Sequence, residues 1–162
     1  MVVMDQWSRK IIGFAVIHSN VNGTSLCSMF NSIVSHRDYP NRLSHDHDPL
    51  FHFGQWTRNL SVFEIDEIWT VPHVPWSHPF VERLIGSVRR GLLDRILFWN
   101  EVDLLRKLKH YQKYFNEARV HSGIAGSIPQ NCYLSLISKK ANPNDLIWKK
   151  YCHGLFDVPM VA

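Results

Sequence analysis

The chain has 162 residues, of which 45% are hydrophobic, so a single compact domain of this length can bury a real core. Eighteen Lys and Arg residues against fourteen Asp and Glu residues give a net charge of +4, which permits a polyanionic partner without proving one. Three widely spaced cysteines, Cys27, Cys132 and Cys152, exclude a disulfide framework and a CxxC pair and indicate a reducing compartment.

The N-terminal stretch is apolar, but Asp5, Arg9 and Lys10 interrupt it before it reaches the length of a signal sequence or a membrane span. We therefore expect a cytoplasmic protein that has no membrane partner. Within this stretch, residues 2–6 and 10–18 are rich in Val, Ile and Phe and are separated by a polar turn, which predicts two strands of an antiparallel hairpin.

The next two elements are a helix and a short strand. Residues 24–35 place apolar side chains at helical spacing and predict a short amphipathic helix. A turn and a brief strand that ends near Asp46 follow it. Asp48 directly precedes Pro49, the pattern of a helix start, with an N-cap carboxylate and a proline at the first helical position.

We expect the helix that Asp48 caps to cover residues 50–59. The segment 60–66, "LSVFEID", is the next candidate strand, because it is short and apolar. Residues 71–79, "VPHVPWSHP", carry too many prolines for regular structure and predict a loop.

Two long helices should follow. The first begins at Phe80, with apolar residues at spacings of three and four that continue to Ile96, and the second runs from Glu101 to about Ala118. Beyond Pro129 the pattern dissolves. The sequence therefore predicts a mixed α/β core in residues 1–130 and a tail in residues 131–162 that has no recognised motif.

This order of elements can bring distant carboxylates to one edge of a sheet. The pair that we single out is Asp46, at a strand end, and Glu82, in the first turn of a long helix. Two-metal phosphoryl-transfer sites use such carboxylates to clamp hard cations. Composition alone would not distinguish these two acids from the others.

Three separated motifs do distinguish them. Thirty-five residues lie between Asp46 and Glu82, within "SHDHDPLF" and "VPWSHPFVERLIGSVRRGLLDR", and "MDQWSRKIIGF" precedes both. The whole pattern, over residues 1 to about 130, resembles the retroviral-integrase-like core of transposases and integrases, the Asp, Asp, Glu family. The closing signature of that family is visible here as Phe115, Asn116, Arg119, His121, Gly123 and Pro129.

The resemblance implies a ribonuclease-H-like mixed sheet flanked by helices and a function in DNA integration or transposition. It implies that Asp46 and Glu82 are catalytic metal ligands for Mg²⁺ or Mn²⁺ in two-metal phosphoryl transfer. It places Arg83, Arg89 and Arg90 against DNA, the transposon ends and the target. It also implies a homo-oligomer and no small-molecule substrate.

The family has a third acid, on a central strand that precedes the equivalent of "VVMDQWSR". Because this chain begins after it, we expect the first, central strand to be absent and the polynucleotidyl transferase to be inactive as this fragment. A truncated fragment is favoured over a decayed remnant, since the amphipathic pattern is well kept. The alternative function is a non-catalytic DNA-binding or multimerisation remnant. We do not expect Asp5 to replace the missing acid.

Structural explanations stand beside these functional ones. Asp48 is explained as a helix N-cap, Glu82 as an ordinary first-turn acid favoured by the helix dipole, and the three arginines as a solvated helix face. His45 and His47 form a His-x-His pair that, together with the cysteines, would make a zinc module, although no ligands at matching spacing support it.

Overall fold

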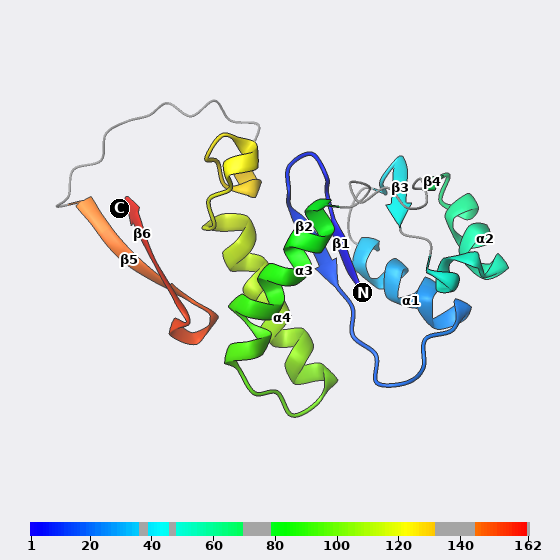
Figure 1. Ribbon diagram of the computed structural model, residues 1–162, viewed down its shortest axis with the longest axis horizontal. Coiled ribbons are helices and arrows are strands. Elements are labelled where there is room, and N and C mark those ends of the chain that lie inside the picture. Colours follow the sequence, from blue (N-terminus) through cyan, green and yellow to red (C-terminus); the bar gives the residue numbers. More distant parts are fainter. Residues whose placement is uncertain (36–38, 46–47, 70–78, 132–144, 162) are drawn as a thin grey trace.

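The computed structural model describes residues 1–35, 39–45, 48–69, 79–131 and 145–161 (Figure 1). The strands are β1 (Val2–Met4), β2 (Ile11–Phe14), β3 (Arg42–His45), β4 (Asp66–Trp69), β5 (Leu146–Tyr151) and β6 (Phe156–Val161). The α-helices are α1 (Gly23–Val34), α2 (Gly54–Val62), α3 (Pro79–Gly91) and α4 (Glu101–Glu117). The architecture is mixed α/β, as predicted. No helix in these described ranges is long and apolar enough to cross a lipid bilayer.

The β1–β2 hairpin is antiparallel, with Val2 opposite Phe14, which confirms the prediction. Its turn is closed by the carboxylate of Asp5, which accepts hydrogen bonds from the backbone N–H groups of Trp7, at 3.1 Å, and Ser8, at 3.2 Å. Burial alone would raise the pKa of Asp5, but the hydrogen bonds from Ser8 and Trp7 outweigh it, so the pKa is lowered. Asp5 therefore serves the turn.

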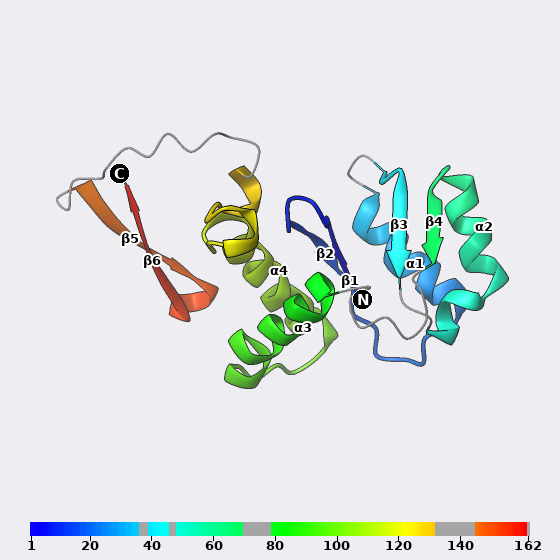
Figure 2. The same ribbon diagram turned by 45° about the horizontal axis from the view of Figure 1, so that its top comes forward.

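The other strand pair, β3 and β4, is parallel, with Arg42 opposite Asp66 and His45 opposite Trp69. In the described part of the chain, β1 pairs only with β2, and β3 pairs only with β4. An edge of β1 and an edge of β3 are thus left without a neighbouring strand among these residues. Figure 2 shows the two pairs as separate sheets with α1 beside both.

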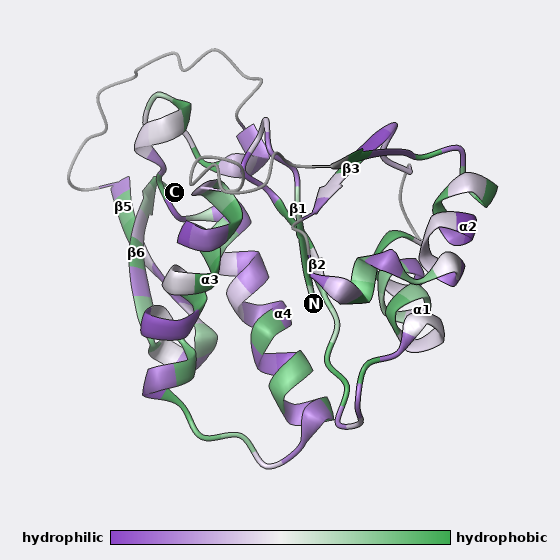
Figure 3. Cartoon of the chain, turned by 45° about the vertical axis from the view of Figure 1, so that its right-hand side comes forward, coloured by the Kyte–Doolittle hydropathy of each residue, from purple (hydrophilic) through white to green (hydrophobic). Residues whose placement is uncertain are grey.

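Two hydrophobic clusters hold the elements together. The first surrounds α1, where Phe30 meets Trp56 of α2 edge to face, with ring centroids 5.3 Å apart. The second joins β2, α3 and α4 through Ile11, Val88 and Tyr111. Figure 3 shows hydrophobic and hydrophilic residues alternating along α3 and α4. Partly buried residues of the β1–β2 hairpin contact both clusters, so the hairpin lies between them.

The segment after Asp48 corrects one expectation. The Asp48 side chain does cap, accepting a hydrogen bond from the Leu50 N–H at 2.9 Å, but it caps only a 3₁₀ turn, η1 (Pro49–His52). Phe53 then adopts an extended conformation, with ψ of 130°, and α2 begins at Gly54. The single predicted helix over residues 50–59 is therefore two elements.

The predicted strand over residues 60–66 is wrong. Helix α2 continues to Val62, and β4 begins only at Asp66. Leu60 lies one helical turn after Trp56, and both side chains are 1% exposed in the first cluster. Their burial against α1 outweighs the strand propensity of the short apolar run.

The two long helices also differ in how well the pattern predicts them. Helix α4 covers Glu101–Glu117 with Ala118 as its C-cap, as expected. Helix α3 ends at Gly91, earlier than its apolar residues predict, because Leu92 leaves the helical conformation with φ of −126° and a 3₁₀ turn, η2 (Leu93–Arg95), follows. Leu92 is still buried, so the second cluster includes residues beyond the end of the helix.

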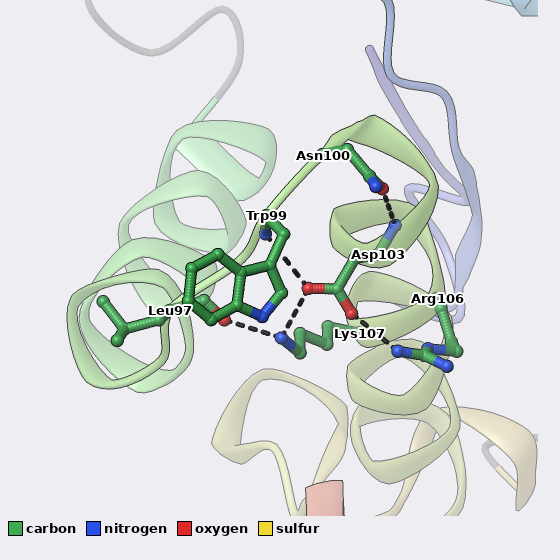
Figure 4. Close-up of polar contacts among 6 residues, drawn as sticks. All are labelled: Leu97, Trp99, Asn100, Asp103, Arg106 and Lys107. Carbon is green, nitrogen blue, oxygen red and sulfur yellow. Dashed lines mark hydrogen bonds and ion pairs between the residues drawn. The ribbon is translucent and has the colours of Figure 1, made fainter.

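The connection between α3 and α4 is fixed by one carboxylate (Figure 4). Asp103, in the first turn of α4, accepts hydrogen bonds from Lys107 Nζ and Arg106 Nη2, both at 2.7 Å, and from the Trp99 N–H at 3.2 Å. Lys107 Nζ also donates to the Leu97 carbonyl at 2.6 Å. The Lys107 and Arg106 hydrogen bonds lower the pKa of Asp103 from its ordinary 3.8 to about 2.

Residues 146–161, in the region where the sequence shows no motif, form an antiparallel hairpin of β5 and β6. The hairpin docks on α4 through aromatic rings: Tyr114 stacks on Phe156 with centroids 4.0 Å apart, and Tyr151 lies 5.8 Å from Tyr114. Figures 1 and 2 both show α4 between this hairpin and β1–β2. Five of the six β5 residues are exposed, so the strand lacks the alternation that would have predicted it.

Candidate nucleic-acid interface

Helix α3 carries four of the five predicted site residues. Glu82 lies in its first turn and is exposed, and the structure gives its carboxylate no hydrogen bond or ion pair within the described residues. Arg83, Arg89 and Arg90 are exposed on the same helix. Arg89 follows Glu82 by seven residues, about two helical turns, so the two side chains share one face.

Asp46, the fifth predicted site residue, lies outside the described residues, as does His47. Strand β3 runs to His45, directly before it, which agrees with a strand ending near Asp46. The structure therefore places the strand that leads to Asp46.

His45 is turned into the first hydrophobic cluster and is 7% exposed. Its Nε2 lies 2.7 Å from Glu67 Oε1, and the same oxygen accepts a hydrogen bond from Trp56 Nε1 at 3.1 Å. The imidazole also stacks on Phe51, with centroids 4.2 Å apart. These contacts fix the end of β3. Among the described residues, no group of three His, Cys, Asp or Glu side chains could hold a metal ion. Two members of the predicted zinc module, His47 and Cys132, lie outside these residues.

Arg9 is a neighbour of the first turn of α3 that the sequence patterns do not reveal. It lies in the β1–β2 turn with a φ of 63°, and its guanidinium carbon sits 3.2 Å from the centroid of the Phe80 ring, at the start of α3. Burial, followed by repulsion from Arg83, lowers the pKa of Arg9, although Asp5 opposes this. Arg9 thus adds positive charge at the start of α3, close enough to Arg83 to be repelled by it, from an element distant in sequence. No spacing rule would have found it.

The two arginines of the last turn of α3 remain accessible. Arg89 Nε lies 3.9 Å from Asp94 Oδ1 in an exposed pair, and such pairs contribute about 0–1 kcal/mol, so Asp94 does not sequester it. The Arg90 guanidinium lies back along the helix over Gly86, where an added Cβ would come within 3.1 Å of Arg90 Nη1. Gly86 therefore leaves room for the Arg90 side chain on the exposed side.

Asn116, from the closing motif, serves the sheet. It is 6% exposed, its Oδ1 accepts from the Ile11 N–H, and its Nδ2 donates to the Ile11 carbonyl, both at 2.9 Å. Gln112 Nε2 donates to the carbonyls of Ile11 and Ile12 at 3.0 and 2.9 Å. Side chains of α4 thus supply β2 with the hydrogen bonds that a neighbouring strand would make.

Arg119 and His121 of the same motif tie the helices together. Arg119 donates to Tyr111 Oη at 3.1 Å and to Ser87 Oγ, on α3, at 3.3 Å. His121 packs on Phe115, with centroids 4.5 Å apart, and burial followed by the charge of Arg119 lowers its pKa to about 4, so it is neutral at pH 7. The closing motif therefore positions α3 against α4.

The chemistry that this face offers is limited to what its residues supply. An exposed carboxylate without a protein partner is the ligand type that hard divalent cations take, and Glu82 fits that requirement. One carboxylate does not make a metal site, and no cluster of three such ligands is present in the described ranges. Guanidinium groups suit phosphate oxygens, so the arginines fit a polyanion.

Part of the chain matches a known protein family. The family model described as Integrase core domain matches residues 64–129. This range holds α3 and α4, and with them Glu82, the three arginines and Asn116, but neither the β1–β2 hairpin nor β3. No relative is found among curated protein sequences.

Solved structures extend the likeness to nearly the whole chain. A chain of the simian T-cell lymphotropic virus intasome in complex with a PP2A regulatory subunit matches with a TM-score of 0.67 and 17% identity, over 98% of this chain and 58% of that one. The HTLV-2 integrase catalytic core domain in complex with magnesium, in a dimeric form, matches with a TM-score of 0.62 and 17% identity, over 83% of this chain and 82% of that one.

The catalytic core domain of BIV integrase gives a TM-score of 0.62 and 19% identity, over 82% of this chain and 83% of that one. At such identities the likeness concerns the fold, which is the ribonuclease-H-like fold of these catalytic cores. The chain spans a little over half the length of the matched intasome chain.

Proposed function

Since the chain carries an integrase-like core, we propose that it serves DNA integration or transposition, with the exposed face of α3 against DNA. The observation that supports this proposal is the grouping on that face. Glu82 is exposed and has no partner among the described residues, Arg89 lies two turns beyond it, and Arg9 adds charge at the start of the helix.

We propose that the arginines hold DNA through its phosphates. Arg83, Arg89 and Arg90 are exposed, and a guanidinium can donate two parallel hydrogen bonds to one phosphate. Neutralising phosphates releases condensed counterions, so binding should weaken steeply as salt rises. Base-specific contacts are not part of this proposal, since phosphate contacts position a protein without reading sequence.

We further propose that Asp46 and Glu82 are metal ligands for Mg²⁺ or Mn²⁺. When bound, the metal would supply activation of a water or a 3′-hydroxyl for attack on a phosphodiester. The role of this chain's own residues is to present Glu82 from a rigid helix and to hold DNA beside it. The HTLV-2 core was solved with magnesium, which supports the choice of metal.

A third carboxylate is needed for this chemistry, and we propose that it belongs to a strand between β1 and β3, each of which has one edge without a neighbouring strand among the described residues. Asp5 does not fill the role, because its oxygens already accept hydrogen bonds in the β1–β2 turn. The 162-residue chain alone should therefore bind DNA without strand transfer.

The test measures binding and chemistry separately on the purified 162-residue protein. We expect fluorescence anisotropy with a labelled duplex to show salt-sensitive binding, and assays with Mg²⁺ or Mn²⁺ to show no end processing or strand transfer. An absence of DNA binding would overturn the proposed function. Robust strand transfer that is lost in Asp46→Asn would overturn the inactivity of this chain.

The alternative function is a non-catalytic DNA-binding or multimerisation part of a larger assembly. The multimerisation part is supported by the HTLV-2 core, which was solved in a dimeric form. Light scattering tests the multimerisation role. A protein that stays monomeric at every concentration, with and without DNA, would contradict it.

A further inference from the structure

A basic pocket lies between α4 and the β5–β6 hairpin, far in sequence from the predicted site. It has a volume of about 470 Å³. Helix α4 contributes His110 and Lys113, strand β5 contributes Lys149 and Lys150, and the turn after β5 contributes His153. Its lining contains three lysines and two histidines and no acidic side chain. We call it the hairpin pocket.

The walls of the hairpin pocket are held by packing. The hairpin is anchored on α4 by the stacked rings of Tyr114 and Phe156. The turn between β5 and β6 passes through left-handed conformations, with φ of 57° at His153 and 86° at Gly154. This turn brings the His153 ring to 5.0 Å from that of His110. Basic residues therefore line the hairpin pocket from two docked elements.

Among the described residues, no ion pair includes a lysine or histidine of the hairpin pocket. Lys149 Nζ lies 5.2 Å from the Tyr151 ring, a cation–π contact that keeps the ammonium at the wall. Asp157 is opposite Lys150 in the ladder, but the ion pairs found among the described residues include neither. Burial raises the pKa of the Cys152 thiol to about 11, so this residue adds no negative charge at neutral pH.

We propose that the hairpin pocket binds a backbone phosphate of nucleic acid, as a second contact beside the face of α3. This inference rests on the proposed function and deepens it. A cluster of lysines provides the charge that phosphates require. A base needs an aromatic platform, and Tyr151, the one aromatic ring of the lining besides the histidines, already faces Lys149. The lining therefore selects phosphate over the base of a free nucleotide.

The test compares two double variants of equal charge in the full chain. Lys149→Gln/Lys150→Gln removes two ammonium groups from the hairpin pocket, whereas Arg95→Gln/Lys109→Gln removes two charges from exposed positions outside it. In a salt series with a labelled DNA duplex, the pocket variant should lower the slope of log K against log salt by about 1–2, since each phosphate that is no longer neutralised reduces the slope by about 0.9. The control should keep the wild-type slope.

A second measurement does not depend on how the variants fold. Acetylation of the wild-type protein, read by mass spectrometry, should show Lys113, Lys149 and Lys150 protected by the DNA duplex while Lys109 stays reactive. Tripolyphosphate at the same phosphate concentration should protect them less. Equal protection by tripolyphosphate would overturn the nucleic-acid assignment in favour of free phosphates.

The outcomes separate the two proposals. If the wild-type protein binds DNA but the pocket variant matches the control in slope and Lys149 stays reactive, the hairpin pocket is overturned and the proposed function stands. If the wild-type protein does not bind DNA at all, the proposed function fails, and protection by tripolyphosphate alone would then show a pocket for free phosphates.

Discussion

The two hydrophobic clusters bury polar side chains for different purposes. In the first cluster, the side chains of His45 and Trp56 both hydrogen-bond to the Glu67 carboxylate, at the end of the strand that leads to Asp46. In the second, Asn116 and Gln112 bond to the backbone of β2. The first group fixes the end of β3, directly before Asp46. The second supplies hydrogen bonds to β2, which pairs only with β1 among the described residues. Buried polar side chains therefore fix a position in one cluster and satisfy a strand backbone in the other.

The largest effect should come from the first cluster. Trp56→Ala removes a 1%-exposed ring together with the donor to Glu67, so we expect a loss of about 3–5 kcal/mol in the free energy of unfolding. Urea denaturation measures it. Trp56→Phe, which keeps most of the ring volume, should lose less. Equal losses would show that the hydrogen bond dominates over the packing.

In the second cluster, the next largest effect should come from the hydrogen bond between Asn116 and the backbone N–H of Ile11. Asn116→Leu leaves the buried Ile11 N–H without an acceptor, and we expect the free energy of unfolding to fall by about 2–4 kcal/mol because of this unsatisfied donor and the poorer packing. Gln112→Leu is the matched control, since it removes only donors to carbonyls, one of which Asn116 also serves. A decrease in Gln112→Leu as large as in Asn116→Leu would contradict the pairing role of Asn116.

A smaller effect on stability, and one that depends on pH, should come from Asp103 in the connection between α3 and α4. The pKa of Asp103 is about 2 in the folded protein against an ordinary 3.8, so folding favours its carboxylate form. That stabilisation is complete above pH of about 4 and is lost as the pH falls toward about 2. When melting temperature is measured from pH 7 downwards, it should therefore fall less steeply below pH of about 4 in Asp103→Asn than in the wild-type protein. The same fall in both proteins would contradict this role of Asp103.

Local patterns predicted those parts of the fold that local chemistry determines. The β1–β2 hairpin, α1 and α4 follow from apolar periodicity, and Asp48 caps as the Asp-Pro pair indicates. The predicted strand over residues 60–66 failed because Leu60 packs beside Trp56 on α1, a contact between distant elements. The end of α3 at Gly91 is missed for a related reason: Leu92 stays in the core after the helix ends.

The candidate site likewise contains residues that sequence spacing predicted and residues that only the structure reveals. Sequence spacing put Glu82 and Arg89 on one helix face, because seven residues complete two turns. It could not find Arg9, which reaches Phe80 from a turn some seventy residues earlier in the chain, as the residue numbers show. It also could not assign Asn116 to the β2 edge, or build a pocket from α4 and a hairpin whose strand shows no alternation.

The central claim is that the exposed face of α3 contacts DNA, and site-specific photocrosslinking tests it most directly. Ile85, on α3 near Glu82, is 52% exposed, and Val62, at the end of α2, is 73% exposed, so each accepts a benzoylphenylalanine in turn. We predict efficient, salt-sensitive crosslinking of a DNA duplex at position 85 and only background at position 62. Equal crosslinking at the two positions, or more at position 62, would contradict this claim.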